Sequence, residues 1–347
     1  MQVERGVKRS IRSRLCFYLV PVDIFGGIQL RVVVITQGIT QVLQSVIESK
    51  HKVVGIVDCA PINEPNKFIR AAGRFLTGIN YSFTSNPLSL KLFSRKLQIP
   101  YYYLRKGDSK GLEIWVRRVE PDLIVIYSMS HLLKENIFNI PLYGTINIHY
   151  SYLPEYRGPN PLFWEYYDYI LDLGVTLHYV DKGEDTGDII CQERVIISSG
   201  EKLEETGQKL VSTGIKLLSE AMEALENGSV GIKQQPVDTP TPRARKIKPE
   251  EYNKLIKWED WGVERVFHFL NGTPKYHSAL LKKNSLCRLG FSIRVLDYEN
   301  CNTFGYKVGN LYKDKSIYFF ACKDGKIYVE IKPSLDNLFA RIYPLIS

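Results

Sequence analysis

The sequence predicts an α/β protein in which an open, mostly parallel sheet is followed by a small β domain. Between residues 31 and 226, short apolar runs rich in β-branched residues alternate with segments whose apolar residues recur at helical spacing. Beyond residue 259, short strand-like runs alternate with glycine-containing turns. A chain of 347 residues is also long for a single domain, so the length favours two.

The first regular unit is a strand, a helix and a second strand. Residues 31–36 read Arg-Val-Val-Val-Ile-Thr, which is typical of a strand buried on both faces. Apolar residues between 39 and 47 then recur at helical spacing, and residues 53–57 form another apolar run. Because neighbouring parallel strands need a crossover connection, this order indicates a βαβ unit.

The alternation continues as far as residue 149. Asn86 and Pro87 suit the N-cap and the first position of the next helix. Residues 60–85 show no clear period, and we expect a surface loop or a short helix there. We predict helices at residues 88–97, at 111–119 and shortly before 144, and strands at 101–104, 122–127 and 144–149.

A proline-rich turn at residues 153–161 begins the second half of this α/β region. An aromatic helix should follow the turn, and then two strands around a polar loop at residues 181–188. Gly228 should close a long helix. The strands are expected at residues 175–180 and 189–197, and the helix at residues 202–226.

These patterns divide the chain into four parts. Residues 1–30 resemble a signal peptide, but Pro21 and Asp23 interrupt the apolar core and no A-x-A cleavage site follows. We therefore interpret these residues as an irregular extension or a misplaced start codon. In the C-terminal part we expect a helix at residues 259–270, and Lys323-Asp-Gly between two strand-like runs predicts a hairpin. The parts are an N-terminal extension (1–30), an α/β domain (31–233), a linker (234–258) and a C-terminal β domain (259–347).

The net charge of +9 is concentrated at the two ends of the chain. The charges of residues 1–30, 31–239 and 240–347 are +3, −2 and +8. The long middle section is therefore not attracted to polyanions in general.

No apolar run approaches the roughly 18 to 20 residues of a membrane-spanning helix, so we expect no membrane partner. The six cysteines form no C-x-x-C pair, which favours a reducing cytoplasm over a disulfide framework.

Three polar side chains are candidates for a functional site. Asn147 and His149 lie two apart on a predicted strand, so they share one face at its carboxyl end, where open α/β sheets bind ligands. Asp185 follows the carboxyl end of another predicted strand, between Gly183 and Gly187, and can converge with them. Each of the three, taken alone, is more often a structural polar group or a turn residue. We interpret His178, inside a predicted strand, as a packed and hydrogen-bonded histidine.

Several other chemistries have little support. One histidine and one carboxylate are fewer strong ligands than a zinc or iron site normally has, so we expect no metal. The sequence has no G-x-S-x-G elbow, and the first strand leads into Thr36-Gln-Gly-Ile-Thr40 rather than a G-x-G-x-x-G or G-x-x-x-x-G-K-[ST] motif. Serine-nucleophile, dinucleotide and nucleotide-triphosphate sites therefore lose most of their support.

A longer pattern resembles the folate-dependent formyltransferase family. It reads Gly144-Thr-Ile-Asn-Ile-His-Tyr-Ser-Tyr-Leu-Pro-Glu-Tyr-Arg-Gly-Pro-Asn-Pro161, then Gly174-Val-Thr-Leu-His-Tyr-Val and Glu184-Asp-Thr-Gly-Asp-Ile-Ile-Cys-Gln192. The family has an N-x-H motif, a Leu-Pro turn and a later D-x-G in this order. The resemblance extends over residues 31–332 and implies a Rossmann-like catalytic domain followed by an OB-like β domain.

The resemblance also implies which residues act and on what. The co-substrate would be N10-formyltetrahydrofolate, with Asn147 stabilising the oxyanion, His149 handling a proton and Asp185 orienting the imidazole. Arg157 and Trp164 would lie on the acceptor side, although Arg157 could equally pin the turn and Trp164 could belong to the core. The pterin of the folate would lie against Ser128, Met129, Ser130, His131, Leu132 and Asp181.

Sequence details favour one acceptor class. The stretch Tyr156-Arg-Gly-Pro-Asn-Pro-Leu-Phe-Trp164 resembles sugar-nucleotide N-formyltransferases, whereas methionyl-tRNA formyltransferases usually read W-R-G-A-A-P-I. The loop after Asp58 also lacks the R-P-A-G-R-G-like insert of the tRNA enzymes. We therefore expect a nucleotide-linked amino sugar, such as a dTDP-amino-dideoxyhexose, used for a surface polysaccharide such as a lipopolysaccharide O-antigen.

Other possibilities remain open. Methionyl-tRNA is the alternative acceptor, and the basic C-terminal section is its best argument, because cationic side chains supply most non-specific affinity for nucleic acid. Only in that case would we expect a nucleic-acid partner. A C-terminal β region can also mediate a homodimer. Finally, the fold could persist as a non-catalytic module.

Overall fold

The computed structural model describes residues 29–59, 89–129, 131–274 and 291–333. Most of the predicted N-terminal extension, the segment predicted at residues 60–85, and the Asn86-Pro87 pair lie outside these ranges. The described residues form a seven-stranded sheet and a separate four-stranded sheet. In spatial order, the large sheet contains β3 (Tyr101–Leu104), β2 (Lys52–Cys59), β1 (Arg31–Thr36), β4 (Leu123–Ile126), β5 (Thr145–His149), β6 (Asp172–Tyr179) and β7 (Ile189–Ile196).

The large sheet is parallel on one side and antiparallel on the other. Neighbouring strands from β3 through β5 run parallel, whereas β6 runs antiparallel to β5, and β7 antiparallel to β6. This confirms the predicted open, mostly parallel α/β sheet. The helices around it, and those that follow, are α1 (Gln41–Glu48), α3 (Leu90–Lys96), α4 (Ser109–Val119), α5 (Glu135–Phe138), α6 (Pro161–Asp168), α7 (Leu203–Glu226), the 3-10 helix η2 (Pro249–Lys254) and α8 (Val263–Gly272).

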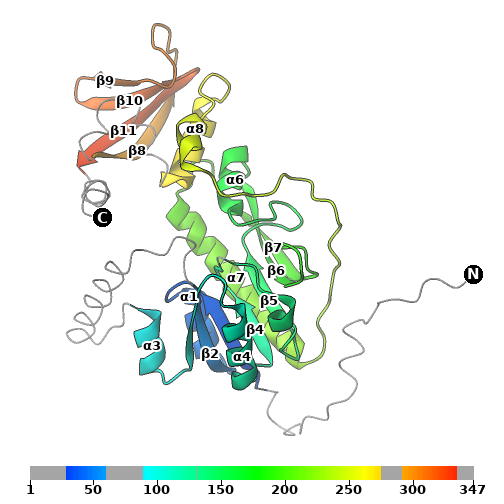
Figure 1. The fold of residues 1–347 in the computed structure, drawn as a ribbon. Coiled ribbons are helices and arrows are strands. Elements are labelled where there is room, and N and C mark those ends of the chain that lie inside the picture. The colour runs from blue at the N-terminus through cyan, green and yellow to red at the C-terminus, as the bar shows by residue number, and fades with distance from the viewer. Residues whose placement is uncertain (1–28, 60–88, 130, 275–290, 334–347) are drawn as a thin grey trace, which may run out of the picture.

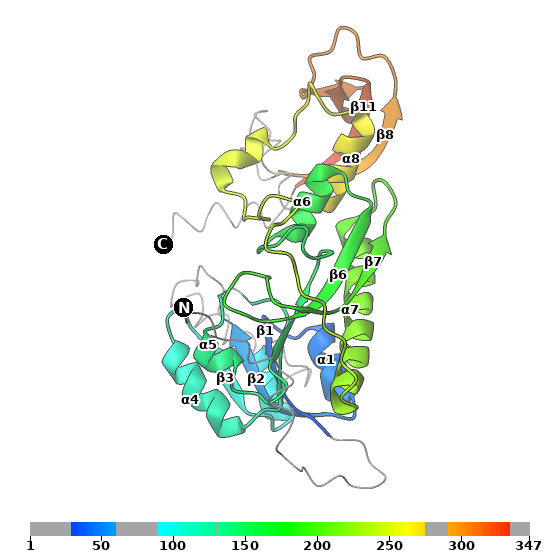
Figure 2. The same cartoon turned by 90° about the vertical axis from the view of Figure 1, so that its right-hand side faces the viewer.

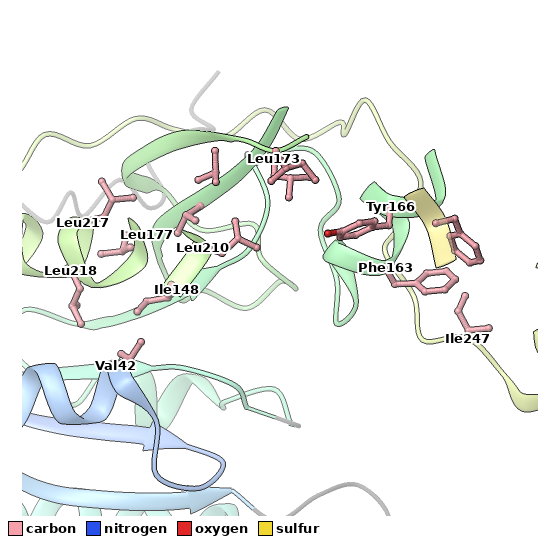
Figure 3. Packing of buried hydrophobic residues seen from close by; sticks show 14 of the residues in the cluster. Val42, Ile148, Phe163, Tyr166, Leu173, Leu177, Leu210, Leu217, Leu218 and Ile247 are labelled. Atoms are coloured by element: carbon pink, nitrogen blue, oxygen red, sulfur yellow. The ribbon is translucent and has the colours of Figure 1, made fainter. Parts of the chain in front are cut away.

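Helices cover both faces of the large sheet, which explains why its central strands are continuously apolar. In β1, Val32 and Val34 belong to one buried cluster together with α1 and α7, while Val33 and Ile35 belong to a second one with α4 and α5. Figure 2 shows α1 and α7 on one side of the strands and α4 and α5 on the other. The close view in Figure 3 shows Ile148 near the leucines of α7.

The second sheet has the order β8-β11-β10-β9 and is antiparallel throughout. Its members are β8 (Phe291–Asn300), β9 (Leu311–Asp314), β10 (Ile317–Cys322) and β11 (Gly325–Pro333), and Figure 1 shows them apart from the large sheet, with α8 alongside. The hairpin predicted at Lys323-Asp-Gly is confirmed, because β10 and β11 pair there. The C-terminal β domain is therefore present as a separate antiparallel sheet.

The starts of α3 and α8 differ from the predicted ones. Ser89 is the N-cap of α3, with its hydroxyl accepting from the Leu92 N–H at 3.3 Å, so the helix begins later than residue 88. Helix α8 begins at Val263 rather than at residue 259, because the Val263 N–H donates to Asp324 Oδ1 at 2.8 Å. That cap comes from the turn between β10 and β11, and no local pattern could predict it.

Among the residues that the structure describes, no helix combines the length and the apolar character needed to cross a membrane.

Candidate active site

Strand β5 places Asn147 and His149 beside each other, as predicted. Thr145, Asn147 and His149 alternate with Ile146 and Ile148, which belong to the buried cluster that includes α7. The polar residues therefore share the other face, and Asn147 and His149 stand toward the strand's carboxyl end. His149 is almost fully buried, with 6% of its surface exposed.

Asp185 reaches the same place by a route that the sequence argument did not predict. Because β6 runs antiparallel to β5, its carboxyl end lies at the opposite edge, with Tyr179 paired to Ile146. The loop after β6 therefore has to fold back across β5 to bring Asp185 to His149. The convergence is confirmed, but the expected reason for it, two carboxyl ends at one edge, is wrong.

Close backbone contacts hold this returning loop. A Cβ atom on Gly187 would lie 1.8 Å from the Tyr179 carbonyl oxygen, so only glycine fits there. The Gln235 amide donates to the carbonyl oxygens of Asp185 (3.2 Å) and Gly187 (2.6 Å). Asp181 Oδ1 accepts from the Thr186 hydroxyl at 2.7 Å. The loop therefore depends on the linker residue Gln235 as well as on its own residues.

The Asp185 carboxylate is the centre of the cluster. Its Oδ2 accepts from the Gly158 N–H at 2.9 Å and lies 3.6 Å from His149 Nδ1. Its Oδ1 lies 3.4 Å from Asn147 Nδ2 and 3.6 Å from His178 Nε2. The side chain is 15% exposed, so one carboxylate connects the carboxamide and both imidazoles in a largely dry site.

Burial and charge set the protonation states here. Burial by itself raises the pKa of Asp185, but the charge that His149 carries when it is protonated, the contact with His178 and the Gly158 N–H outweigh burial and hold that pKa below its usual range. Burial lowers the pKa of His149, which the Asp185 charge only partly opposes. The resting site at neutral pH therefore has an ionised carboxylate beside a neutral imidazole. The His149 Nε2–H donates to the Tyr156 carbonyl oxygen at 3.2 Å, which leaves Nδ1 free to take a proton on the Asp185 side.

A cavity of about 320 Å³ adjoins this cluster. Its walls include Asn147, His149 and Asp185, and its volume is at the lower end of ligand pockets, which span roughly 300–1,000 Å³. Such a cavity can take one end of an extended ligand, such as the ring system of a folate, and leaves the rest outside. Five of the residues predicted to contact the folate also line it: Ser128, Met129, His131, Leu132 and Asp181. Ser130 lies outside the described residues.

The two residues predicted for the acceptor side lie outside the lining of this cavity. Arg157 is 8% exposed, and its guanidinium donates to Gln235 Oε1 (2.8 Å) and to the carbonyl oxygens of Pro236 (2.8 Å) and Val237 (3.1 Å). Trp164 donates its indole N–H to the Arg245 carbonyl oxygen at 2.8 Å. Neither is among the described residues that line the cavity. Both side chains bind the linker. For Arg157, this agrees with the alternative that it holds the proline-rich turn in place.

His178 is the residue that sequence reasoning underestimated. It is packed and hydrogen-bonded as expected, at 2% exposed, but it also lines the cavity and contacts Asn147 and Asp185. Its ring lies edge-on to His149, with 6.2 Å between centroids. Strand pairing could have revealed this, since His178 is the direct partner of Asn147 on β5.

Across the described part of the chain, no three or more His, Cys, Asp or Glu side chains are grouped so that they could hold a metal ion.

Comparison with known proteins identifies the family of this chain. The model of the family described as formyl transferase matches residues 30–222, more than half of the chain. The chain belongs to the formyl transferase family. As a formyl transferase it is an enzyme of folate-dependent formyl transfer.

Individual relatives extend the comparison. Methionyl-tRNA formyltransferase of Phocaeicola vulgatus is 29% identical over 83% of this chain and 85% of its own. An N-formyltransferase of Helicobacter canadensis, solved with folinic acid and dTDP-3-aminofucose, has a TM-score of 0.57 and 14% identity, and the match covers 88% of this chain and 100% of that one. HypX of Aquifex aeolicus has a TM-score of 0.54 and 14% identity over 88% of this chain, which spans 46% of HypX. At 14% identity the two structures show a shared fold.

Proposed function

We propose that this enzyme transfers the formyl group of N10-formyltetrahydrofolate to the amine of a nucleotide-linked amino sugar. The observation that carries this choice is the charge of the cavity wall. The side chains that line it and can carry a charge near neutral pH are histidines and the acidic Asp181, Glu184 and Asp185, and no lysine or arginine lines it among the described residues. Affinity for tRNA comes largely from cationic side chains that neutralise phosphates. A nucleotide sugar carries only two phosphates, and the hexose keeps them away from the reacting amine.

The cluster can support each step of this transfer. The amine nitrogen attacks the formyl carbon, and an N–H of Asn147 can stabilise the oxyanion of the tetrahedral intermediate. The bond from the formyl carbon to N10 then breaks as the new amide forms. The proton that the amine loses can pass through His149 Nδ1, which lies 3.6 Å from Asp185 Oδ2, to the leaving nitrogen N10. The transfer written in this way needs no oxidant, reductant or metal.

The wall beside the cluster adds support for a small acceptor. The turn that resembles sugar-nucleotide enzymes contributes Gly158, Pro159 and Pro161 to the cavity. Arg243, 58% exposed and paired with Glu184, is a cation at this rim that could meet a phosphate. The product would be an N-formylated sugar nucleotide, used for a surface polysaccharide.

Methionyl-tRNA is the second candidate acceptor, and a specific observation favours it. Curated relatives such as the Phocaeicola vulgatus protein carry that name, and their similarity extends over most of this chain. The charge of +8 on residues 240–347 is the physical argument for the same choice.

One assay compares the two candidates. The enzyme is incubated with N10-formyltetrahydrofolate and, separately, with a panel of dTDP- and UDP-amino sugars or with methionyl initiator tRNA, and products are analysed by mass. We expect a gain of one formyl group on an amino sugar and none on the tRNA. Formylation of methionyl-tRNA alone would contradict the proposal and support the second candidate.

A further inference from the structure

We infer that His178 is a positioning residue that fixes which way the Asn147 carboxamide points. The inference rests on the proposed function, because it concerns the amide that would meet the formyl oxygen. The two side chains face each other across β5 and β6, where Asn147 and His178 are direct partners. Asn147 Nδ2 and His178 Nε2 are 3.1 Å apart.

The surroundings of the imidazole determine which ring nitrogen is protonated. His178 Nδ1 lies 2.9 Å from the Tyr179 carbonyl oxygen, and a carbonyl can only accept. Nδ1 therefore carries the hydrogen, and in the tautomer with this hydrogen alone Nε2 presents a lone pair. The pairing of β6 with β7 is irregular between Leu177 and His178, so a bulge accompanies this ring.

That lone pair sets the orientation of the amide. In the observed orientation, one Nδ2 hydrogen of Asn147 can be donated to His178 Nε2, while the second points along a weak 3.4 Å contact to Asp185 Oδ1. The flipped amide would place its oxygen against the Nε2 lone pair and the Asp185 carboxylate, and both contacts would be repulsive. The Asp185 contact is long enough that a formyl oxygen in the cavity can compete for the second hydrogen.

The charged and titratable groups that face His178 are few. Asp185 approaches Nε2 from the loop after β6, and His149 packs edge-on from β5. An apolar residue at 178 would remove the acceptor and leave Asn147 free to turn. His178 thus acts through Asn147 and not on the substrate.

Steady-state kinetics of His178 variants, made both in the otherwise unsubstituted protein and in an Asn147→Ala background, test this role. His178→Leu removes the acceptor, whereas His178→Gln keeps an oxygen that can accept the same hydrogen. With the acceptor that the panel identifies, we expect His178→Leu to lower kcat by about 10- to 100-fold, with KM for the folate within threefold and the thermal midpoint little changed. We expect His178→Gln to recover much of the loss. In an Asn147→Ala background, His178→Leu should have almost no further effect, because the residue through which it acts is gone.

Equal losses from His178→Leu in both backgrounds would overturn the inference, as would a rise in KM without a fall in kcat. A second measurement is independent of turnover: ¹⁵N NMR of the histidine side chains in the unsubstituted protein should show His178 protonated at Nδ1 and not at Nε2. The opposite tautomer would also overturn it. If the unsubstituted enzyme transferred formyl to no acceptor, the proposed function would fail, while the NMR result would still decide the position of the proton.

Discussion

The Asp185 side chain connects the polar groups of the candidate site. A carboxylate that contacts His149, His178, Asn147 and the Gly158 N–H can hold a carboxamide and a neutral imidazole in place together. Asp185 also adopts a positive φ of 55°, which Asp tolerates better than most residues. At the residue scale, the site is therefore a network whose members fix one another.

The state of His149 gives a prediction about pH. Burial lowers its pKa below the ordinary value of 6.5, and the Asp185 charge opposes this shift. The proton-accepting form should therefore persist as the pH falls through 6.5. We expect NMR to place the titration midpoint of His149 below 6.5, and lower still in Asp185→Asn, because the charge that favours the imidazolium is removed. A midpoint above 6.5, or an upward shift in Asp185→Asn, would contradict this description.

Sequence reasoning found Asn147, His149 and Asp185 because their types and order are local features. The alternation along β5 puts the first two on one face whatever the rest of the fold does. The contact of His178 with Asn147 depends on the register between two strands, which no single stretch of sequence encodes. The position of Arg157 depends on where the linker passes, and this again is a property of the whole chain.

At the scale of elements, the returning loop after β6 is the decisive feature. The sequence predicted the strands and the loop but not that β6 runs antiparallel, because apolar runs do not encode strand direction. Glycine at position 187 allows the loop to cross against the Tyr179 backbone. A chain of contacts from Arg157 through Gln235 to the loop holds it in place.

Two glycine-to-alanine substitutions test this element. Gly187→Ala places a Cβ where the Tyr179 carbonyl oxygen lies, so the loop must shift and take Asp185 with it. We expect a loss of about 1–3 kcal/mol in the free energy of unfolding and at least a tenfold loss of kcat. The control is Gly207→Ala, inside α7, where the added Cβ meets no atom within 4 Å apart from its chain neighbours and the adjacent backbone of its own helix.

The control should raise the free energy of unfolding by about 0.5–1 kcal/mol through helix propensity and leave turnover unchanged. Urea denaturation and steady-state rates on both variants give the comparison. Full activity in Gly187→Ala would mean that the loop does not position Asp185 as described.

At the scale of the whole molecule, charge and chemistry are separated along the chain. The section that holds the site carries −2, and the excess of +8 lies in residues 240–347. The two parts are nevertheless packed together through α6 and α8, where Phe163 lies 5.7 Å from Phe269 between ring centroids. The fold class and the second β sheet were predictable from periodicity, whereas this packing was not, because it joins residues about a hundred positions apart.

We propose that formyl transfer takes place at the cluster around Asp185. The most direct measurement compares the unsubstituted enzyme with Asp185→Asn, following release of tetrahydrofolate from N10-formyltetrahydrofolate in the presence of the acceptor, and binding of folinic acid by calorimetry. We expect Asp185→Asn to lower kcat at least 100-fold, within the range of about 10² to 10⁴ for lost proton-transfer assistance, while the Kd for folinic acid stays within about threefold. Turnover in Asp185→Asn equal to that of the unsubstituted enzyme would contradict it.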